Sequence, residues 1–387
     1  MQNTETAVAE TGAWLSERQE AMVGLLRRIV DIDSGSHDKA GVDRVVTTLA
    51  EVFGDAGLTP EVIPRERNGN LLRVRIGPRQ ERGGVLLLGH CDTVFPAGEA
   101  ARRPFTVRGT RAHGPGVADM KAGVVMNAFV LLALARQGRL AQPVTALFTG
   151  DEEIASPASQ EIIRAEATGA RAVFNAEPGR PGGEVVTGRR ACLFLRLRIT
   201  GKAAHSGVNF EQGRSALVAL AHKILALQAL CDPSRLISVN VGLASGGQSA
   251  NTVAPSAEAA LDVRYADPAD RAPLMQAIGS ILTAAHVEGT TTEYTVDGAF
   301  PPFASSPASD ALFRHYVAGA AAEGERIVGT CTMGAADSGF AAETGAPTLC
   351  GTGPVGGHYH SPDEYIELPS LLGRARLVAR AILTLPD

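Results

Sequence analysis

The segment Val85–Leu88, followed at once by Gly89-His90-Cys91-Asp92-Thr93-Val94, most constrains what this 387-residue chain can fold into. Four apolar residues after Gly83-Gly84 are typical of a strand buried on both faces of a mostly parallel sheet. Such sheets carry functional groups just beyond the carboxyl ends of their strands. In extended backbone His90 and Asp92 point to the same side, which suits a metal-ligating imidazole beside a carboxylate. A strand-end histidine and a helix-capping aspartate would look the same, so this motif alone leaves both interpretations open.

Two later segments repeat this arrangement of a short apolar strand with acidic residues at its end. Val144–Phe148 leads into Asp151-Glu152-Glu153, and the apolar residues that begin at Ala172 lead into Glu177. Adjacent carboxylates at the end of a core strand repel one another unless a cation or water shares them. A solvated acidic surface remains the alternative interpretation of the same residues.

Asp119 lies in the turn Gly114–Lys121, directly before Val124–Leu134, an apolar segment that predicts a buried helix. Taken alone, Asp119 has the simple interpretation of a helix N-cap. Taken together, His90, His360 and several carboxylates at strand ends and in loops offer the imidazole nitrogens and carboxylate oxygens that suit zinc. A shared carboxylate would let two such ions lie about 3.5–4 Å apart, as in two-metal hydrolases.

Composition excludes several other classes of protein. The net charge of -5 argues against a nucleic-acid or membrane-surface protein. Five scattered cysteines without a CxxC pair predict no disulfide framework and no thiolate zinc site. The polar, acidic N-terminus lacks the apolar core of a signal peptide, and we expect no apolar run of membrane-spanning length. Cytoplasmic localisation is the expectation.

From about Arg190 the pattern changes to alternating apolar and charged residues. Cys192–Ile199 predicts a strand with one solvated face. The predicted order strand–helix–strand–strand–helix–strand, reaching about Tyr294, is typical of a small α+β unit with ferredoxin-like topology. We therefore expect two domains, one formed by residues 1–189 and 302–387 and the other by 190–301.

The order of six short motifs resembles the zinc metallopeptidases of the M20 type, a family with a catalytic and a dimerisation domain. The motifs occupy residues 89–94, 116–121, 151–153, 176–178, 201–207 and 360–365. Together they extend over nearly the whole chain. The resemblance implies an α/β fold: a phosphorylase/aminopeptidase-like catalytic domain with a mixed, mostly parallel sheet. It also implies an inserted α+β ferredoxin-like dimerisation or lid domain.

The resemblance also implies a role for each site residue. Two Zn²⁺ per subunit would be held with Asp119 as the shared ligand, one ion by His90 and Glu177 and the other by Glu153 and His360. Glu152 would be the general base that takes a proton from a water between the metals and passes it to the leaving amine. Asp92 would select the His90 tautomer. His358 is an alternative ligand, but the Glu364-Tyr365 pair that follows favours His360 in this role.

In the smaller domain, three residues match family positions. His205 resembles a histidine that reaches into the partner subunit and stabilises the oxyanion, which implies a homodimer. Asn251 and Arg264 would bind substrate, with Arg264 as a fork for a carboxylate. The structural alternatives are a surface-loop role for His205 and an ion pair of Arg264 with Asp262 or Asp267.

Within the family the similarity is greatest to the glutamate carboxypeptidases, which cleave a C-terminal glutamate from folate-like or N-acyl substrates. It rests on residues 33–36, 93–96 and 334–339. Cys91 stands where those enzymes often have Met. No lysine shortly after Glu177 aligns with the one that would hold a glutamate side chain, and Arg189 or Arg190 could substitute for it.

We therefore predict a dizinc amidohydrolase that releases an amino acid, expected to be glutamate or another acidic residue, from small peptidyl or N-acyl substrates. The alternative enzyme is an aminoacylase-like deacylase of the same fold. A metal-stabilised scaffold is the non-enzymatic alternative, and it would leave Glu152 without a function. A serine hydrolase is disfavoured because no G-x-S-x-G motif follows a predicted strand.

Overall fold

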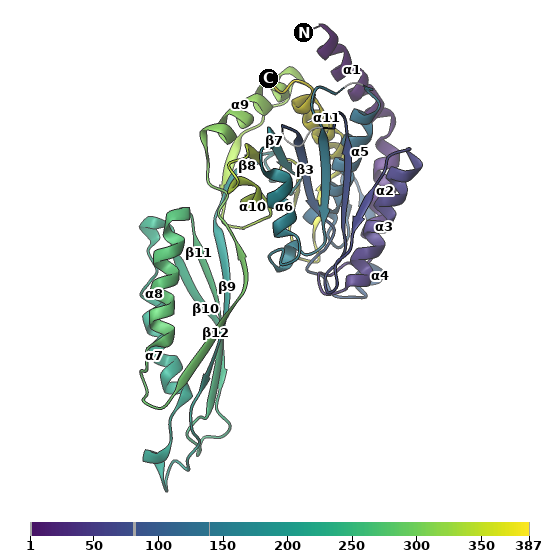
Figure 1. The fold of residues 1–387 in the computed structure, drawn as a ribbon. Coiled ribbons are helices and arrows are strands. Elements are labelled where there is room, and N and C mark those ends of the chain that lie inside the picture. Colours follow the sequence, from purple (N-terminus) through teal and green to yellow (C-terminus); the bar gives the residue numbers. More distant parts are fainter. Residues whose placement is uncertain (1, 80–82, 139, 387) are drawn as a thin grey trace. The chain divides into compact units, whose positions relative to one another are not determined.

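The computed structural model describes residues 2–79, 83–138 and 140–386. These divide into two compact units. The first contains 1–188, 305–332 and 336–387, and the second contains 189–304 with 333–335. Figure 1 traces the chain through both.

A mixed, mostly parallel sheet forms the centre of the first unit and confirms the predicted fold class. Its strand order is β1-β2-β6-β3-β7-β14. The pairs β6–β3, β3–β7 and β7–β14 are parallel, whereas β1–β2 and β2–β6 are antiparallel. The strands are β1 (Glu61–Ile63), β2 (Leu71–Ile76), β3 (Val85–His90), β6 (Val144–Thr149), β7 (Ala172–Asn175) and β14 (Thr348–Leu349).

Helix α5 (Ala122–Ala135) is the core helix of this unit. It contacts β3 and β6 as well as α1, α2 and α11, and every residue from Ala122 to Leu134 is buried. A helix that is apolar all round is expected where neighbours surround it. The other helices of the unit are α1 (Gln2–Glu17), α2 (Gln19–Val30), α3 (Lys39–Asp55), α4 (Glu99–Arg102), α6 (Gln160–Ala167), α9 (Pro307–Ala322), α10 (Ser338–Ala342) and α11 (Leu368–Leu383).

One helical stretch, Val117–Ala135, is long and apolar enough to cross a membrane by length and composition. The expectation that no apolar run reaches this length was therefore wrong. However, 94% of the apolar window is buried inside the protein, as in the core helix of a globular unit.

A second, small sheet brings together the segments that carry Asp119 and His360. Its order is β15-β16-β5-β4. In it, Tyr365 pairs with His113, so the segment after His360 lies next to the segment that leads to Asp119. The strands are β4 (Thr106–Arg108), β5 (Arg111–His113), β15 (Gly356–Gly357) and β16 (Tyr365–Glu367), and a further pair joins β8 (Val185–Arg189) to β13 (Gly329–Thr332).

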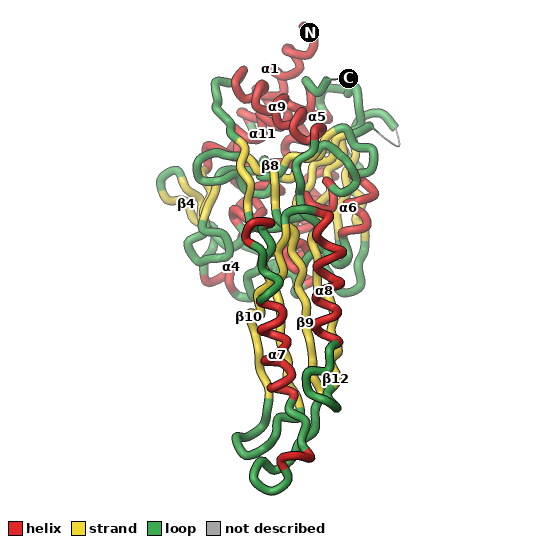
Figure 2. Tube along the Cα trace, turned by 90° about the vertical axis from the view of Figure 1, so that its left-hand side faces the viewer, coloured by secondary structure: helices red, strands yellow, loops and turns green. Residues whose placement is uncertain are grey.

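The second unit has the predicted ferredoxin-like arrangement. Its antiparallel strands lie in the order β10-β11-β9-β12, and Figures 1 and 2 both show α7 and α8 on one face of this sheet. Residues of β9 alternate between buried and exposed along most of its length, as a strand with one solvated face should. The elements are β9 (Ala191–Thr200), α7 (Ala216–Gln228), β10 (Ser238–Gly246), β11 (Ser256–Tyr265), α8 (Arg271–Thr283) and β12 (Thr291–Phe300).

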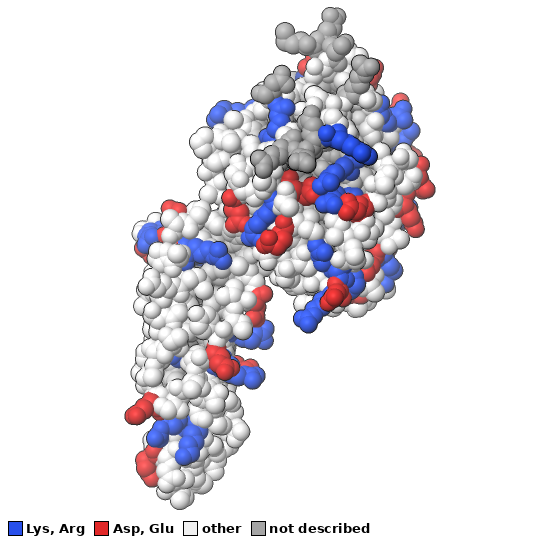
Figure 3. Space-filling view, viewed as in Figure 1, with Lys and Arg blue, Asp and Glu red and all other residues white. Residues whose placement is uncertain are grey.

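Charged side chains of both signs are interspersed on the face shown in Figure 3. The ion pairs of the first unit include those of Arg73 and Arg75, which both pair with Glu166. This mixture accords with the modest net charge of -5.

Candidate functional site

Three neighbouring strands of the central sheet end at the same edge and deliver the candidate residues there. His90 is the last residue of β3 and pairs with Thr149, the last residue of β6. Glu152 and Glu153 follow β6 in a short 3-10 helix, Glu152–Ile154. Glu177 follows β7, which lies on the other side of β3. Parallel strands that share an edge therefore gather these side chains, although the residues lie far apart in sequence.

Asp119 reaches the same place from the turn Val117–Lys121 that precedes α5. The buried carboxylate of Glu364 holds this turn by accepting three backbone hydrogen bonds. Oε2 accepts from the N–H of Gly116 (3.1 Å), and Oε1 accepts from those of Ala118 (2.8 Å) and Asp119 (2.9 Å). Because Glu364 follows His360 by four residues, one side chain ties together the two segments that carry Asp119 and His360.

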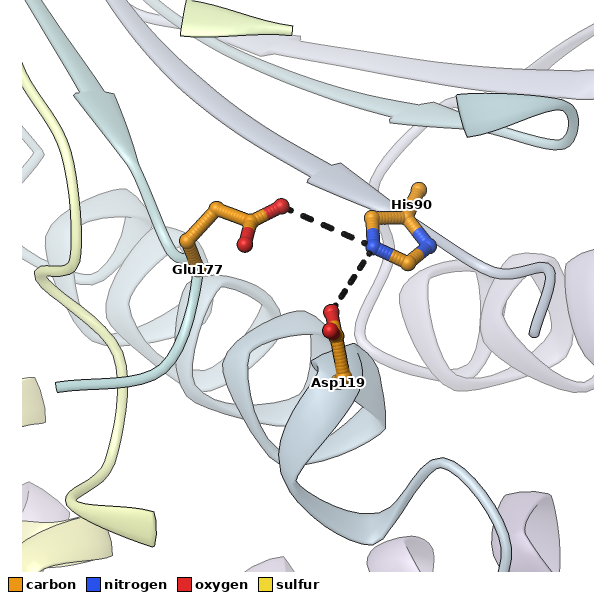
Figure 4. Close-up of side chains that lie close together, drawn as sticks. All are labelled: His90, Asp119 and Glu177. Atoms are coloured by element: carbon orange, nitrogen blue, oxygen red, sulfur yellow. Dashed lines mark hydrogen bonds and ion pairs between the residues drawn. The ribbon is translucent and has the colours of Figure 1, made fainter. Parts of the chain in front are cut away.

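The candidate ligands form two groups that share Asp119. In the first, Nε2 of His90 lies 3.2 Å from Oδ1 of Asp119 and 3.6 Å from Oε1 of Glu177, as Figure 4 shows. In the second, Nε2 of His360 lies 3.4 Å from Oδ2 of Asp119 and 3.3 Å from Oε2 of Glu153. Within each group the possible ligand atoms lie within 4.8 Å of one another. Each oxygen of Asp119 faces a different group, which is the geometry of a carboxylate shared between two cations.

Asp92 organises the residues around His90. Its main-chain oxygen lies 3.0 Å and its Oδ1 lies 3.4 Å from Nδ1 of His90, so Nε2 is left facing the ligand groups. The Asp92 carboxylate also accepts hydrogen bonds from the Ser36 hydroxyl (2.7 Å) and from the backbone N–H groups of Glu152 and Glu153 (both 3.1 Å). One buried aspartate thus orients the imidazole and the turn that carries both glutamates.

The electrostatics of the cluster are those of buried acids held close together. Burial, aided by repulsion from Asp119, raises the pKa of Glu153 to about 7. Burial likewise raises the pKa of Glu152 well above its usual value, although the positive charge of His90 acts to lower it. Hydrogen bonds to Asp119 and Glu153 raise the pKa of His360 to about 10. A bound cation would reverse this balance, because it favours ionised carboxylates and neutral imidazoles.

Sequence reasoning missed another buried acid behind this cluster. Asp337, at the start of α10, accepts hydrogen bonds from the hydroxyls of Ser156 and Thr149, the latter at 3.2 Å. Burial raises its pKa to about 7, and its charge contributes to the raised pKa of Glu152. Asp337 lies in residues 334–339, a turn of small residues that carried part of the family resemblance, and this could have drawn attention to it.

Glu364 and Ser36 were also left without roles. Both lie inside segments that carried the resemblance, residues 360–365 and 33–36, and that was the signal that could have drawn attention to them. Their function depends on contacts with Asp119 and Asp92, which lie far away in sequence.

The three predicted residues of the smaller domain all belong to the second unit, so they are not among the groups gathered in the first. His205 is exposed, and its Nδ1 accepts a hydrogen bond from the N–H of Gly207 (3.1 Å). Asn251 is exposed and accepts from Ser249 (2.8 Å).

Arg264 forms an ion pair with Asp262, one of the two partners that the sequence allowed. Its Nε lies 2.6 Å from Oδ1 of Asp262, and its Nη2 lies 3.0 Å from Oδ2. The substrate-binding role of Arg264 remains a prediction, as do those of His205 and Asn251.

Two alternatives raised from the sequence are also located. His358 packs edge-on against Tyr365, with ring centroids 5.7 Å apart, and belongs to neither ligand group. Nη1 of Arg189, suggested as a partner for a glutamate side chain, donates to the carbonyl oxygens of Gly334 (3.2 Å) and Ala335 (3.3 Å).

Comparison with known proteins gives consistent matches over the chain. The model of Peptidase family M20/M25/M40 matches residues 86–384. Carboxypeptidase G2 from Pseudomonas sp. (strain RS-16) is 30% identical over 378 residues, which cover 96% of this chain and 90% of that protein. Acetylornithine deacetylase from Yersinia pseudotuberculosis serotype O:1b (strain IP 31758) is 26% identical, with coverage of 93% and 96%.

The fold also matches solved structures. The M20 family metallo-carboxypeptidase Sso-CP2 from Sulfolobus solfataricus superposes with a TM-score of 0.76 at 16% identity, and the match covers 94% of this chain and 98% of that one. At this identity the likeness concerns the fold.

Proposed function

The chain belongs to peptidase family M20/M25/M40, and from this premise we propose that it hydrolyses the amide bond of an N-acyl or peptidyl amino acid with two bound metal ions. Family membership makes it a hydrolase of the peptidase and amidohydrolase class. The proposal adds the metal pair, the residue roles and the released amino acid.

One observation carries the proposal: Asp119 presents its two oxygens to two ligand groups, and Glu152 lies beside them without belonging to either. The carboxylate of Glu152 comes within 3.9 Å of Nε2 of His90. A carboxylate that lies next to the metal ligands but is not itself a ligand has the position that a general base requires. A scaffold held together by metals would have no need for such a residue.

The residues present fit a pair of zinc ions. Each group offers one imidazole nitrogen and two carboxylates, a donor set that zinc accepts. Oε1 of Glu153 is buried and has no hydrogen-bond partner, so a cation would satisfy a group that is otherwise costly to bury. Cys91 belongs to neither group, and burial raises the pKa of its thiol to about 12, so it stays protonated and packs in the core. We assign His90, Asp119 and Glu177 to one ion and Asp119, Glu153 and His360 to the other.

The bound ions would polarise the substrate carbonyl and lower the pKa of a coordinated water towards neutrality. Glu152 accepts the proton of the attacking water. Glu152 then delivers that proton to the leaving amine. Asp92 keeps His90 in the tautomer that presents Nε2 to the metal.

The second unit supplies the remaining proposed roles. We assign His205 to the oxyanion of the partner subunit's substrate in a homodimer, and Asn251 and Arg264 to substrate binding. Asp262 already pairs with Arg264, so a substrate carboxylate would have to compete with that ion pair or join it. For the released amino acid we propose glutamate or another acidic residue, on the resemblance to glutamate carboxypeptidases. Deacylation of N-acyl amino acids is the second candidate, favoured by the similarity to acetylornithine deacetylase.

The test combines metal content with hydrolysis on one purified sample. The panel would contain Nα-acetyl and Nα-benzoyl derivatives of L-glutamate and L-ornithine together with dipeptides that end in glutamate, each with and without chelator. Two zinc ions per chain and chelator-sensitive release of glutamate would support the carboxypeptidase assignment. Release of ornithine alone would move the specificity to the deacylases. Absence of both metal and turnover would favour the scaffold.

A further inference from the structure

Lys121 carries a buried charge that the proposed mechanism does not use. It ends the turn Val117–Lys121, two residues after Asp119, and only 1% of its surface is exposed. Its Nζ donates a hydrogen bond to the carbonyl oxygen of Ile32 at 2.8 Å. Lysine is almost never buried to this extent unless a partner uses its charge or its donors. The contacts of the segment around Ile32 therefore indicate what Lys121 does.

That segment, residues 31–36, follows α2 and binds the loop that comes after β3. The carboxylate of Asp33 accepts a hydrogen bond from the N–H of Gly98 at 2.7 Å. The carboxylate of Asp31 accepts one from the N–H of Phe105, also at 2.7 Å. The carbonyl that Lys121 binds lies between these two aspartates, so the ammonium is placed at the centre of the segment.

The same segment also supports the residues around His90. The N–H of Thr93 donates to the carbonyl of Ser34 (2.9 Å), and the N–H of Ser36 donates to the carbonyl of Thr93 (3.2 Å). The Ser36 hydroxyl donates to the carboxylate of Asp92 at 2.7 Å, and Asp92 in turn orients the His90 ring. A displacement of this segment would therefore reach the imidazole through Asp92.

The backbone of Lys121 belongs to the turn that presents Asp119. Its N–H donates to the carbonyl of Gly116 at 2.9 Å, and the Glu364 carboxylate accepts hydrogen bonds from other N–H groups of this turn. Helix α2, which precedes residues 31–36, also packs against the turn. Two side chains thus locate the turn: Glu364 binds its backbone, and Lys121 ties it to residues 31–36.

A second buried lysine shows what a purely structural role looks like. Lys223, in α7 of the second unit, is also 1% exposed. Its Nζ donates to three carbonyl oxygens at the end of α8, those of Ile281 (3.2 Å), Leu282 and Ala284 (both 2.7 Å). A cation in this place satisfies carbonyls that the helix leaves without partners. Ile32 lies just beyond the end of α2, so capping is the structural alternative for Lys121 as well.

We propose that Lys121 is a positioning residue of the metal centre. Its ammonium ties the turn of Asp119 to the segment that supports Asp92, and so fixes His90 relative to Asp119, two ligands of the same candidate ion. The inference rests on the proposed metal pair and adds a residue that belongs to neither ligand group. Because the connection consists of contacts within the protein, it is present before metal binds.

The test compares Lys121→Met with Lys223→Met, its matched control. Methionine keeps an unbranched apolar side chain but has no ammonium. In metal-free Lys121→Met, amide hydrogen exchange should be faster than in wild type in residues 31–36 and 116–121. Its zinc affinity, measured by competition with a chromophoric chelator, should fall roughly 10- to 100-fold. Lys223→Met should speed exchange at the end of α8 and leave zinc affinity unchanged within error.

A purely structural role of Lys121 predicts a different result, namely a lower free energy of unfolding with unchanged zinc affinity of the folded protein. Unchanged zinc affinity in folded Lys121→Met, or unchanged exchange in residues 31–36, would overturn the inference while leaving the proposed function intact. If Lys121→Met does not fold, Lys121→Gln, whose shorter side chain keeps an N–H donor, is measured against the same criteria. Wild-type protein that binds no zinc would refute the proposed metal pair itself, and the inference with it.

Discussion

The hydrogen bonds of Glu364 make a quantitative prediction about the site. Burial raises the pKa of Glu364 to about 7, which is still below pH 8, so its side chain is ionised at that pH. It accepts hydrogen bonds from three backbone N–H groups. Hydrogen bonds to charged groups contribute roughly 1.5–3 kcal/mol each. Glu364→Gln keeps an oxygen for Ala118 and Asp119 but turns an amide N–H₂ towards the N–H of Gly116. Because ionising this buried carboxylate at pH 8 itself costs stability, a cost that Gln removes, we expect Glu364→Gln to lower the free energy of unfolding by only about 1 kcal/mol.

Glu364→Ala leaves all three donors without their acceptor, so the expected loss is larger, about 4–6 kcal/mol. Urea unfolding of the metal-free protein measures it. The only tryptophan, Trp14, packs against Phe129 in the first unit and reports on that unit alone. Because Glu364 ties Asp119 to the His360 segment, zinc affinity should also fall, by roughly 10- to 100-fold.

Glu367→Gln is the matched control. Glu367 lies three residues further along the chain and pairs with Arg111 at the surface, where ion pairs contribute little. It should leave both unfolding and zinc affinity unchanged within error. Equal behaviour of Glu364→Gln and Glu367→Gln would refute the role assigned to Glu364.

Three further predictions concern catalysis and stability. Glu152→Ala should retain both metals by elemental analysis yet lose nearly all turnover; wild-type rates would refute the proton-transfer role. The native state holds the Asp337 proton from about pH 4 to about pH 7, so urea unfolding should show metal-free wild type losing stability as pH rises through that window, more than Asp337→Asn does; the same pH dependence in both proteins would contradict this. Mixing His205→Ala with Asp119→Ala protein should restore some activity if His205 acts across a dimer, and inactive verified heterodimers would exclude this.

The sequence by itself determined the fold class and the set of residues that meet at the edge of the central sheet. His90, Glu152 and Glu177 each follow an apolar strand, and parallel strands bring their carboxyl ends to one edge whatever lies between them. The alternation of apolar and charged residues after Arg190 likewise predicted the second unit, because the side-chain period of a strand is local information.

Tertiary structure alone decided the contacts that hold these residues in place. Asp119 is bound by Glu364, 245 positions away, and Thr149 by Asp337, 188 positions away. Which of two possible partners Arg264 takes was also open until the structure showed Asp262. The periodicity of a sequence predicts which way a side chain faces within its own helix or strand. It does not predict the partner of a buried carboxylate, because that N–H or hydroxyl group is brought within hydrogen-bond distance by the packing of distant segments.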